Sequence, residues 1–498
     1  MPTADQVTPD GADPAGDVLD TPEAGPLALR GGGLRVAGYG GGMLLALVSA
    51  PLVIRHLGQD GFGQFVTALA IASIAIGLVE GGVNTIALRE YAARTGAERD
   101  QAMSSMLGIR LMLSAAGLFA AVAFAAAAGY DGVIVAGTAV AGLGLAIQGV
   151  QMLVSVPLQG TMRLGTVASI DLLRNGLSTA LLIALVLAGA GIVPLLAVAV
   201  PACLVTLVVT ARLVRGMMPL RPEVRFATYA PLLRETFPFA IAIALNSVYF
   251  RVTVVVMSLM ASELETGYFS TSFRVVEIII ALPVLVIGAA YPIVTRAHRD
   301  DPERFRNVVR RMFELSLIAG VGVALMLVLG ARFVTDVLGG PEAAPAAPVL
   351  RIQGLALIGT FVAVAAGFPL LAMSRYRPLL LANGLGLVVT LAAALALVPP
   401  LGAEGAAMAT VAAELVLAVA TVTALVLASP GLRLPLGAVP VVLVAGCAGV
   451  AAGLALGIHP VVDAAVGIVV YGLALALVGR FPPEVGHALH RGPAANDG

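Results

Sequence analysis

Charged and polar side chains recur at helical spacing inside long hydrophobic stretches of this chain. Within residues 166–189, Asp171, Arg174 and Asn175 fall at i, i+3 and i+4, so one face of a helix carries all three. Within residues 236–260, Ser247 and Arg251 are also four apart. A charge at the centre of a membrane helix costs about 2.5–3.5 kcal/mol on insertion scales, so such residues normally face a bundle interior or a wet cavity.

Three more stretches repeat this pattern, with Arg274 and Glu277, with Glu80 and Asn84, and with Glu414. One interpretation is a polar cavity between two helix bundles, whose arginines meet an anionic cargo. The alternative is internal ion pairing that joins helices, which suits the pairs Asp171–Arg174 and Arg274–Glu277. No acid lies within reach of Arg251 on its own helix, so Arg251 is the preferred cargo contact.

These patterns give two sets of candidate site residues. The candidates for binding substrate in the cavity are Arg251, Arg174, Arg274, Asn84, Asn175 and Ser247. The candidates for ion pairing or coupling are Asp171, Glu277, Glu80 and Glu414. Arg110 lies near one end of its hydrophobic stretch, so its guanidinium is expected to extend to the membrane interface.

The elements that must position these residues are membrane helices. The 498 residues are 59% hydrophobic and 12% charged, whereas a soluble domain is about 25% charged. A membrane crossing takes about 20 apolar residues. Fourteen such spans are predicted, at 36–55, 65–87, 104–128, 132–156, 166–189, 191–211, 236–260, 267–290, 313–335, 349–373, 378–398, 403–427, 436–456 and 460–479.

The arginines predict the orientation of these spans. The chain has 29 arginines and no lysine, and 22 of those arginines fall in alternate gaps between spans, beginning with the first gap. Arginine-rich short loops stay cytoplasmic. We therefore expect a multi-pass protein of the inner (plasma) membrane with both termini in the cytoplasm.

The predicted fold class is all-α, with about 14 transmembrane helices in two pseudo-symmetric six-helix bundles plus two C-terminal helices. Setting Gly63 over Gly267 pairs the second predicted span with the eighth, and Gly189 to Gly191 resembles Gly402 to Gly405. The expected organisation is a disordered cytoplasmic tail at 1–30, bundles at 31–211 and 236–428, a cytoplasmic linker at 212–235, two extra helices at 429–480 and a cytoplasmic tail at 481–498.

Several functions are disfavoured by what the chain lacks. Without lysine it has no phosphate-loop lysine, and hence no standard ATPase motor. Its five histidines are scattered, so neither a metal site nor a cofactor is predicted. The gaps on the outer side are short and hold few acids, which argues against an enzyme. No nucleic-acid partner is expected.

Three blocks carry a family resemblance. Residues 51–65 read PLVIRHLGQDGFGQF, followed by EGGVNT at 80–85 and LRE at 88–90. The second block has GYFS at 267–270, then Phe273, Arg274 and Glu277, with Tyr291 and Pro292 further on. The third has VPPLGAEGAA at 398–407, then Glu414. Together they resemble polysaccharide-type lipid-linked oligosaccharide flippases, of the superfamily that also holds multidrug exporters and lipid II flippases.

The resemblance implies a function. It implies a flippase or exporter that moves a polyprenyl-pyrophosphate-linked oligosaccharide or polysaccharide repeat unit from the cytoplasmic to the outer leaflet by alternating access. The implied partners are this lipid-linked glycan, membrane lipids and the polysaccharide assembly machinery. Family members often have an acid two residues after the span-seven arginine, where this chain has Thr253. The alternatives are a multidrug or lipid II exporter of the same superfamily, or a membrane polysaccharide polymerase or ligase.

Overall fold

The computed structural model describes residues 24–80, 82–223, 245, 248, 249 and 251–480. Within these residues the regular elements are helices, and none is a β-strand. The helices are α1 (Ala24–Glu80), α2 (Val83–Ala93), α3 (Gly96–Ala127), α4 (Gly132–Val154), α5 (Val156–Gly160), α6 (Leu164–Leu187), α7 (Ile192–Ala197), α8 (Ala199–Leu213), α10 (Glu263–Asp300), α11 (Pro302–Gly339), the 3₁₀ helix η2 (Gly340–Ala343), α12 (Ala346–Ala372), α13 (Tyr376–Ala428), α14 (Ala438–Leu456) and α15 (Pro460–Leu477). Residues Arg251–Met260 form a further short apolar helix.

The described chain contains 11 helical segments that are long and apolar enough to cross a membrane. An all-helical membrane protein is therefore confirmed. The difference from the 14 predicted spans has two sources: α1 and α13 each cover two predicted spans, and the continuous described helix within the span at 236–260, Arg251–Met260, is too short to cross a membrane. The count of 14 stays a prediction.

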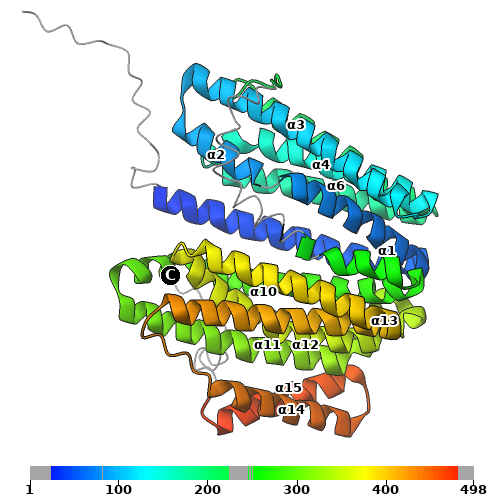
Figure 1. Cartoon of the computed structure of the whole chain (residues 1–498), viewed down its shortest axis with the longest axis vertical. Coiled ribbons are helices and arrows are strands. Elements are labelled where there is room, and N and C mark those ends of the chain that lie inside the picture. The colour runs from blue at the N-terminus through cyan, green and yellow to red at the C-terminus, as the bar shows by residue number, and fades with distance from the viewer. Residues whose placement is uncertain (1–23, 81, 224–244, 246–247, 250, 481–498) are drawn as a thin grey trace, which may run out of the picture.

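Two glycines let α1 and α13 change direction. The backbone leaves helical geometry at Gly58, with φ 69°, and at Gly402, with φ 54°. Positive φ is open to glycine at little steric cost, because it has no Cβ. Figure 1 shows the ribbon of α1 crossing the molecule and then turning back toward α2.

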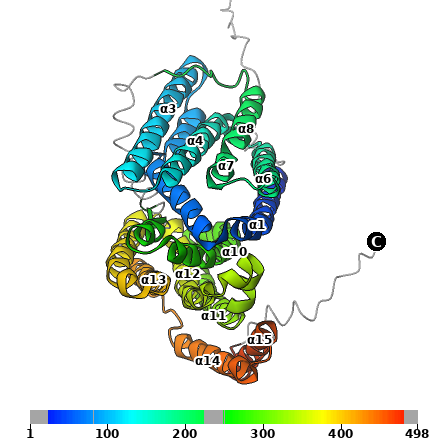
Figure 2. The ribbon, with the colours of Figure 1, turned by 90° about the vertical axis from the view of Figure 1, so that its right-hand side faces the viewer.

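The helices form two groups and a C-terminal hairpin (Figures 1 and 2). We call α1–α8 the first half, and the helix Arg251–Met260 with α10–α13 the second half. The hairpin of α14 and α15 packs on α11, where the Tyr471 hydroxyl donates to the Ile318 carbonyl at 2.9 Å. A Cβ on Gly449 would lie 2.6 Å from the Gly467 carbonyl oxygen, so glycine permits the close approach of α14 to α15.

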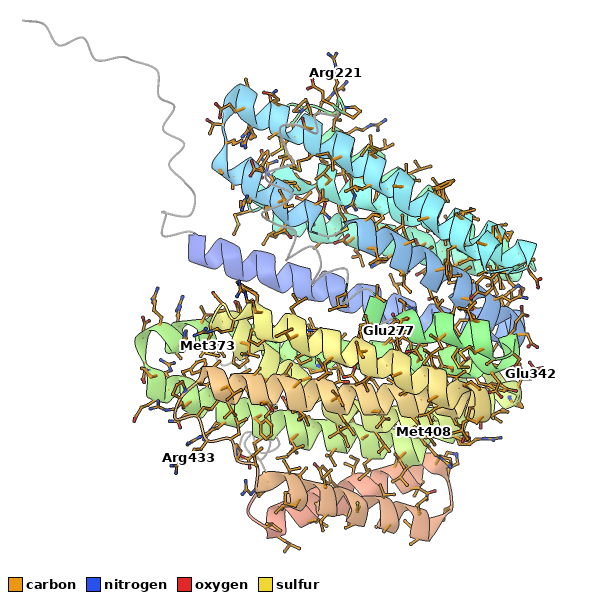
Figure 3. The ribbon with its side chains drawn as sticks, viewed as in Figure 1. Arg221, Glu277, Glu342, Met373, Met408 and Arg433 are labelled. Atoms are coloured by element: carbon orange, nitrogen blue, oxygen red, sulfur yellow. The ribbon has the colours of Figure 1, made fainter. Side chains whose placement is uncertain are left out.

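The two ends of the molecule differ. Figure 3 shows Met373 and Arg433 toward one end, which we call the arginine-rich end, and Glu342 at the opposite end. At the opposite end one buried cluster draws on both halves and includes Ile54 and Phe62 of α1 with Met257 and Phe269. At the arginine-rich end, one buried cluster is built from first-half residues and a separate one from second-half residues and the segment that follows α13.

Side-chain hydrogen bonds reinforce the joint at the opposite end. Arg55 Nη2 donates to the Val337 carbonyl at 2.8 Å, and Gln64 Nε2 donates to Glu263 Oε2 at 2.7 Å. The hydroxyl of Tyr130, in the loop after α3, hydrogen-bonds Ser258 at 2.6 Å. Burial raises the pKa of Tyr130, so its hydroxyl stays neutral at physiological pH.

Candidate functional site

A cavity of about 170 Å³ lies between the two halves. We call it the central cavity. Its described lining residues are Ser49, Ala50, Val53, Phe62, Phe65, Val66, Leu69, Leu182, Arg251, Ser270, Phe273, Arg274 and Glu277. Figure 3 places Glu277 between the two ends of the molecule, at the level of the bundle interior.

Three charged side chains meet in the central cavity. Arg251 Nη2 lies 2.7 Å from Glu277 Oε1, and Arg274 Nη1 lies 2.8 Å from Glu277 Oε2. Arg274 and Glu277 are one turn apart on α10, while Arg251 comes from the preceding short helix. The structure therefore pairs Arg251 with an acid of another helix, which spacing within one helix could not reveal.

The two walls of the central cavity differ in polarity. The first half contributes a mostly apolar wall, in which the rings of Phe62 and Phe65 stack with centroids 6.1 Å apart. The second half contributes Arg251, Arg274 and Glu277, whose side chains keep 22%, 33% and 30% of their surface exposed. The sequence pattern of charges did not indicate the apolar wall, because apolar residues fill every span.

This arrangement can bind an anion. Two arginines and one glutamate leave the cluster with one net positive charge. A guanidinium has five N–H donors in a planar fork that suits carboxylate and phosphate oxygens. Since the apolar wall keeps the local dielectric low, these contacts are stronger here than in water.

The predicted stripe on α6 does not line the central cavity as the described residues define it. Arg174 Nη1 pairs with Asp171 Oδ1 at 3.1 Å on the same helix. A Cβ on Gly42 of α1 would lie 2.5 Å from Asn175 Nδ2, so Asn175 faces α1. Within the described chain, this stripe fits the predicted alternative of an ion pair inside one half.

Of three other predicted residues, Asn84 alone is fully described. Asn84 lies in the first turn of α2, after Gly82 with φ 80°, and its buried Oδ1 has no hydrogen-bond partner among the described residues. Glu80 ends α1, but its side chain lies outside the described residues, and so does all of Ser247.

The expected position of Arg110 is wrong. Its side chain is 0% exposed and is the largest fully buried side chain in the described chain. Arg110 therefore does not reach the interface, because it lies on a face of α3 that is packed inside the first half. A short distance to the end of a hydrophobic stretch says nothing about which face of the helix a residue occupies.

Glu414 forms a second polar site within the second half, which we call the Glu414 pocket. Its carboxylate is 5% exposed and accepts hydrogen bonds from the Tyr249 hydroxyl at 2.7 Å and the Thr360 hydroxyl at 2.8 Å. A cavity of about 20 Å³ adjoins it, with Thr253, Phe273, Thr390 and Thr410 among its lining residues. This volume holds a single water-sized occupant.

A match over more than half of the chain identifies the family. The profile of the family described as "polysaccharide biosynthesis protein" matches residues 28–298, which is more than half of the chain. The chain belongs to this family. The match covers the central-cavity residues of the first half and also Arg251, Arg274 and Glu277. No curated protein matches the chain.

Solved structures share the fold. Lipid II flippase MurJ in an inward closed conformation superposes with a TM-score of 0.73 at 13% identity, covering 92% of this chain and 100% of that chain. An inward-facing multidrug resistance MATE family transporter of the MOP superfamily gives 0.61 at 16% identity, covering 78% and 95%. An outward-facing MATE transporter gives 0.57 at 16% identity, covering 82% and 96%. This member of the family therefore has the fold of MOP superfamily transporters.

Proposed function

We propose that this protein is a flippase that carries a polyprenyl-pyrophosphate-linked oligosaccharide or repeat unit from the cytoplasmic to the outer leaflet. The observation that carries the proposal is the position of Arg251 and Arg274 in a cavity between the halves. The family supplies the glycan class, and the cavity supplies a place for the pyrophosphate. The arginine-rich end is the cytoplasmic end by the positive-inside rule.

The cavity arginines would lower the main energetic cost of such transport, which is the burial of a charged pyrophosphate. A bare pyrophosphate cannot cross lipid, because burying an unpaired charge is too costly. Guanidinium groups offset that cost, while the polyprenyl chain stays in the bilayer. A membrane potential, negative inside, favours outward movement of each negative charge by about 2.3 kcal/mol per 100 mV.

The contacts between the halves support an inward-facing state. The halves share a buried cluster at the opposite end, while clusters at the arginine-rich end draw on one half or the other. A cavity with this enclosure would receive cargo from the cytoplasmic side. Separation of the joint at the opposite end, with closure of the arginine-rich end, would then expose the cavity outward.

The pseudo-symmetry of the two bundles has local support at that joint. A Cβ on Gly63 would overlap the carbonyl oxygen of Glu263, and a Cβ on Gly267 would overlap the carbonyl oxygen of Gln59. The pairing of Gly63 with Gly267 places Gln59 over Glu263, so the two contacts are each other's equivalents. Such reciprocal contacts are what a two-fold axis produces.

A second pair of contacts follows the same relation. In the first half, a Cβ on Gly61 would meet Ile192 at 3.8 Å, just after the segment that begins at Gly189. In the second half, Glu265 Oε2 accepts the Ala403 backbone N–H at 2.7 Å, just after Gly402. Gly61 and Glu265 correspond under the same pairing. These matches favour two bundles built from one repeated plan.

Glu414 is our candidate for coupling. Its two described hydrogen-bond donors, the hydroxyls of Tyr249 and Thr360, are neutral groups. A buried acid with neutral partners binds a proton or a small cation more readily than one neutralised by arginine. With Thr253 at the position where relatives often have an acid, Glu414 is the acid that remains among the described residues of this pocket.

The second candidate function is export of lipid II, since its pyrophosphate would suit the same arginines. A cationic drug is disfavoured by the net positive charge of the central cavity. A polymerase or ligase would need catalytic groups in an outer domain, whereas the described loops at the opposite end are short.

A complementation assay tests the proposal. Cells that lack their own flippase would express wild type, Arg251→Ala or Arg274→Ala, and surface glycan would be measured after membrane insertion is verified. We expect both variants to lose most glycan export and Arg174→Ala to keep it, because Arg174 lies outside the central cavity. Normal export by both cavity variants would rule the assignment out.

A further inference from the structure

Glu277 occupies the place between the two cavity arginines that an incoming phosphate would take. Its Oε1 accepts from Arg251 Nη2 at 2.7 Å, and its Oε2 accepts from Arg274 Nη1 at 2.8 Å. Each guanidinium therefore receives one oxygen of a shared anion. Two oxygens of a phosphate group reproduce this arrangement.

We propose that Glu277 is a built-in competing anion, which lowers the affinity of the central cavity for the pyrophosphate and so permits its release. This inference rests on the proposed function. It assigns to Glu277 a role in setting affinity, which differs from a role in holding the fold together.

The composition of the cavity walls explains why a competing anion is useful. Phe62, Phe65 and Val66 form the wall that faces the arginines across the cavity. Two unpaired guanidiniums beside such a wall would be costly, and a carboxylate between them offsets part of that cost. The same carboxylate stands in the way of any other anion.

The partial exposure of Glu277 allows an arriving phosphate to replace its carboxylate at the arginines. The Glu277 side chain keeps 30% of its surface exposed, and among the described residues each arginine contacts it through one N–H donor. The remaining donors can engage an arriving phosphate before the carboxylate leaves. When the cargo departs, the carboxylate returns to its arginines.

Release is the step that benefits. A transporter must bind its cargo well enough to admit it and weakly enough to let it go. With Glu277 the cluster carries one net positive charge, and without it the cluster carries two. Removal of the carboxylate should therefore tighten binding and slow turnover, which is opposite to the effect of removing an arginine.

Binding of farnesyl pyrophosphate to the purified full-length protein tests the proposal, with uncharged farnesol as the control ligand. We expect Glu277→Gln to bind farnesyl pyrophosphate about tenfold more tightly than wild type, in the range of measured couplings between close charges. Farnesol affinity should not change. Glu314→Gln is the matched control, because Glu314 pairs with Arg480 outside the central cavity.

The outcomes separate the two proposals. Wild type that binds farnesyl pyrophosphate, with folded Glu277→Gln binding it equally or more weakly, overturns the role of Glu277 alone. Wild type that does not bind farnesyl pyrophosphate overturns the proposed function as well. If Glu277→Gln fails to fold, Arg251→Gln is compared with Arg251→Gln/Glu277→Gln, and the double variant must again bind more tightly.

Discussion

The two halves of the molecule place their intramembrane arginines in different surroundings. In the first half, Arg110 is fully buried and Arg174 pairs with Asp171 on its own helix. In the second half, Arg251 and Arg274 line the cavity between the halves and share one acid. An arginine inside a membrane helix is thus no evidence of a ligand site until the surface that it faces is known.

The largest expected effect on transport comes from replacing the second-half arginines. Arg251→Gln or Arg274→Gln should each lower the rate of lipid-linked glycan transport in proteoliposomes by about tenfold to a hundredfold. A hydrogen bond to a charged group contributes about 1.5–3 kcal/mol, which gives this range. Arg174→Gln, the matched change in the first half, should stay within about threefold of wild type. Equal losses in all three variants would erase the contrast between the halves.

The joint at the opposite end gives the next largest effect. Gly267→Ala places a Cβ against the carbonyl oxygen of Gln59, so the halves must move apart there. Such overpacking typically costs about 1–3 kcal/mol, so transport should fall about tenfold. Labelling of an introduced cysteine at residue 59 should become faster from the outer side. Gly176→Ala, where nothing lies within 4 Å of the new Cβ, is the control and should behave as wild type.

A smaller effect is expected from Glu414→Gln. The amide has nearly the shape of the carboxyl group but cannot lose or gain a proton at neutral pH. Transport should fall severalfold and become insensitive to a pH or sodium gradient imposed across proteoliposomes. Retention of full gradient dependence would remove Glu414 as the coupling residue.

The smallest effect tests the hairpin of α14 and α15. Arg480 Nη1 pairs with Glu314 Oε1 at 2.7 Å, and both side chains are about a third exposed, at 33% and 30%. An exposed pair is worth about 0.2–1 kcal/mol. Arg480→Ala should therefore lower the melting temperature only slightly and leave transport unchanged. A large loss of transport would mean that the hairpin takes part in function.

Hydrophobic length was enough to predict an all-helical membrane protein. The spans that end at short loops, such as α4 and α6, appear close to the predicted ranges because turn residues mark their ends. The interruptions inside α1 and α13 also fall between predicted spans: the backbone leaves helical geometry at Gly58, between the spans 36–55 and 65–87, and at Gly402, between the spans 378–398 and 403–427.

The candidate site could be predicted only in part. Spacing found Arg274 with Glu277, since one turn of helix brings them together. The bond from Arg251 to Glu277 joins two helices, and the apolar wall of Phe62 and Phe65 comes from the other half. Such contacts depend on how helices pack, and periodicity within one helix carries no information about that.

Phe273 lines both the central cavity and the Glu414 pocket. Among the described residues, the ring of Phe273 therefore lies between the proposed cargo site and the proposed coupling site. Trimming that ring would open a passage from one site to the other, through which water and small cations could leak without any glycan being carried. Tight stoichiometry between ion and cargo would then depend on one side chain of α10.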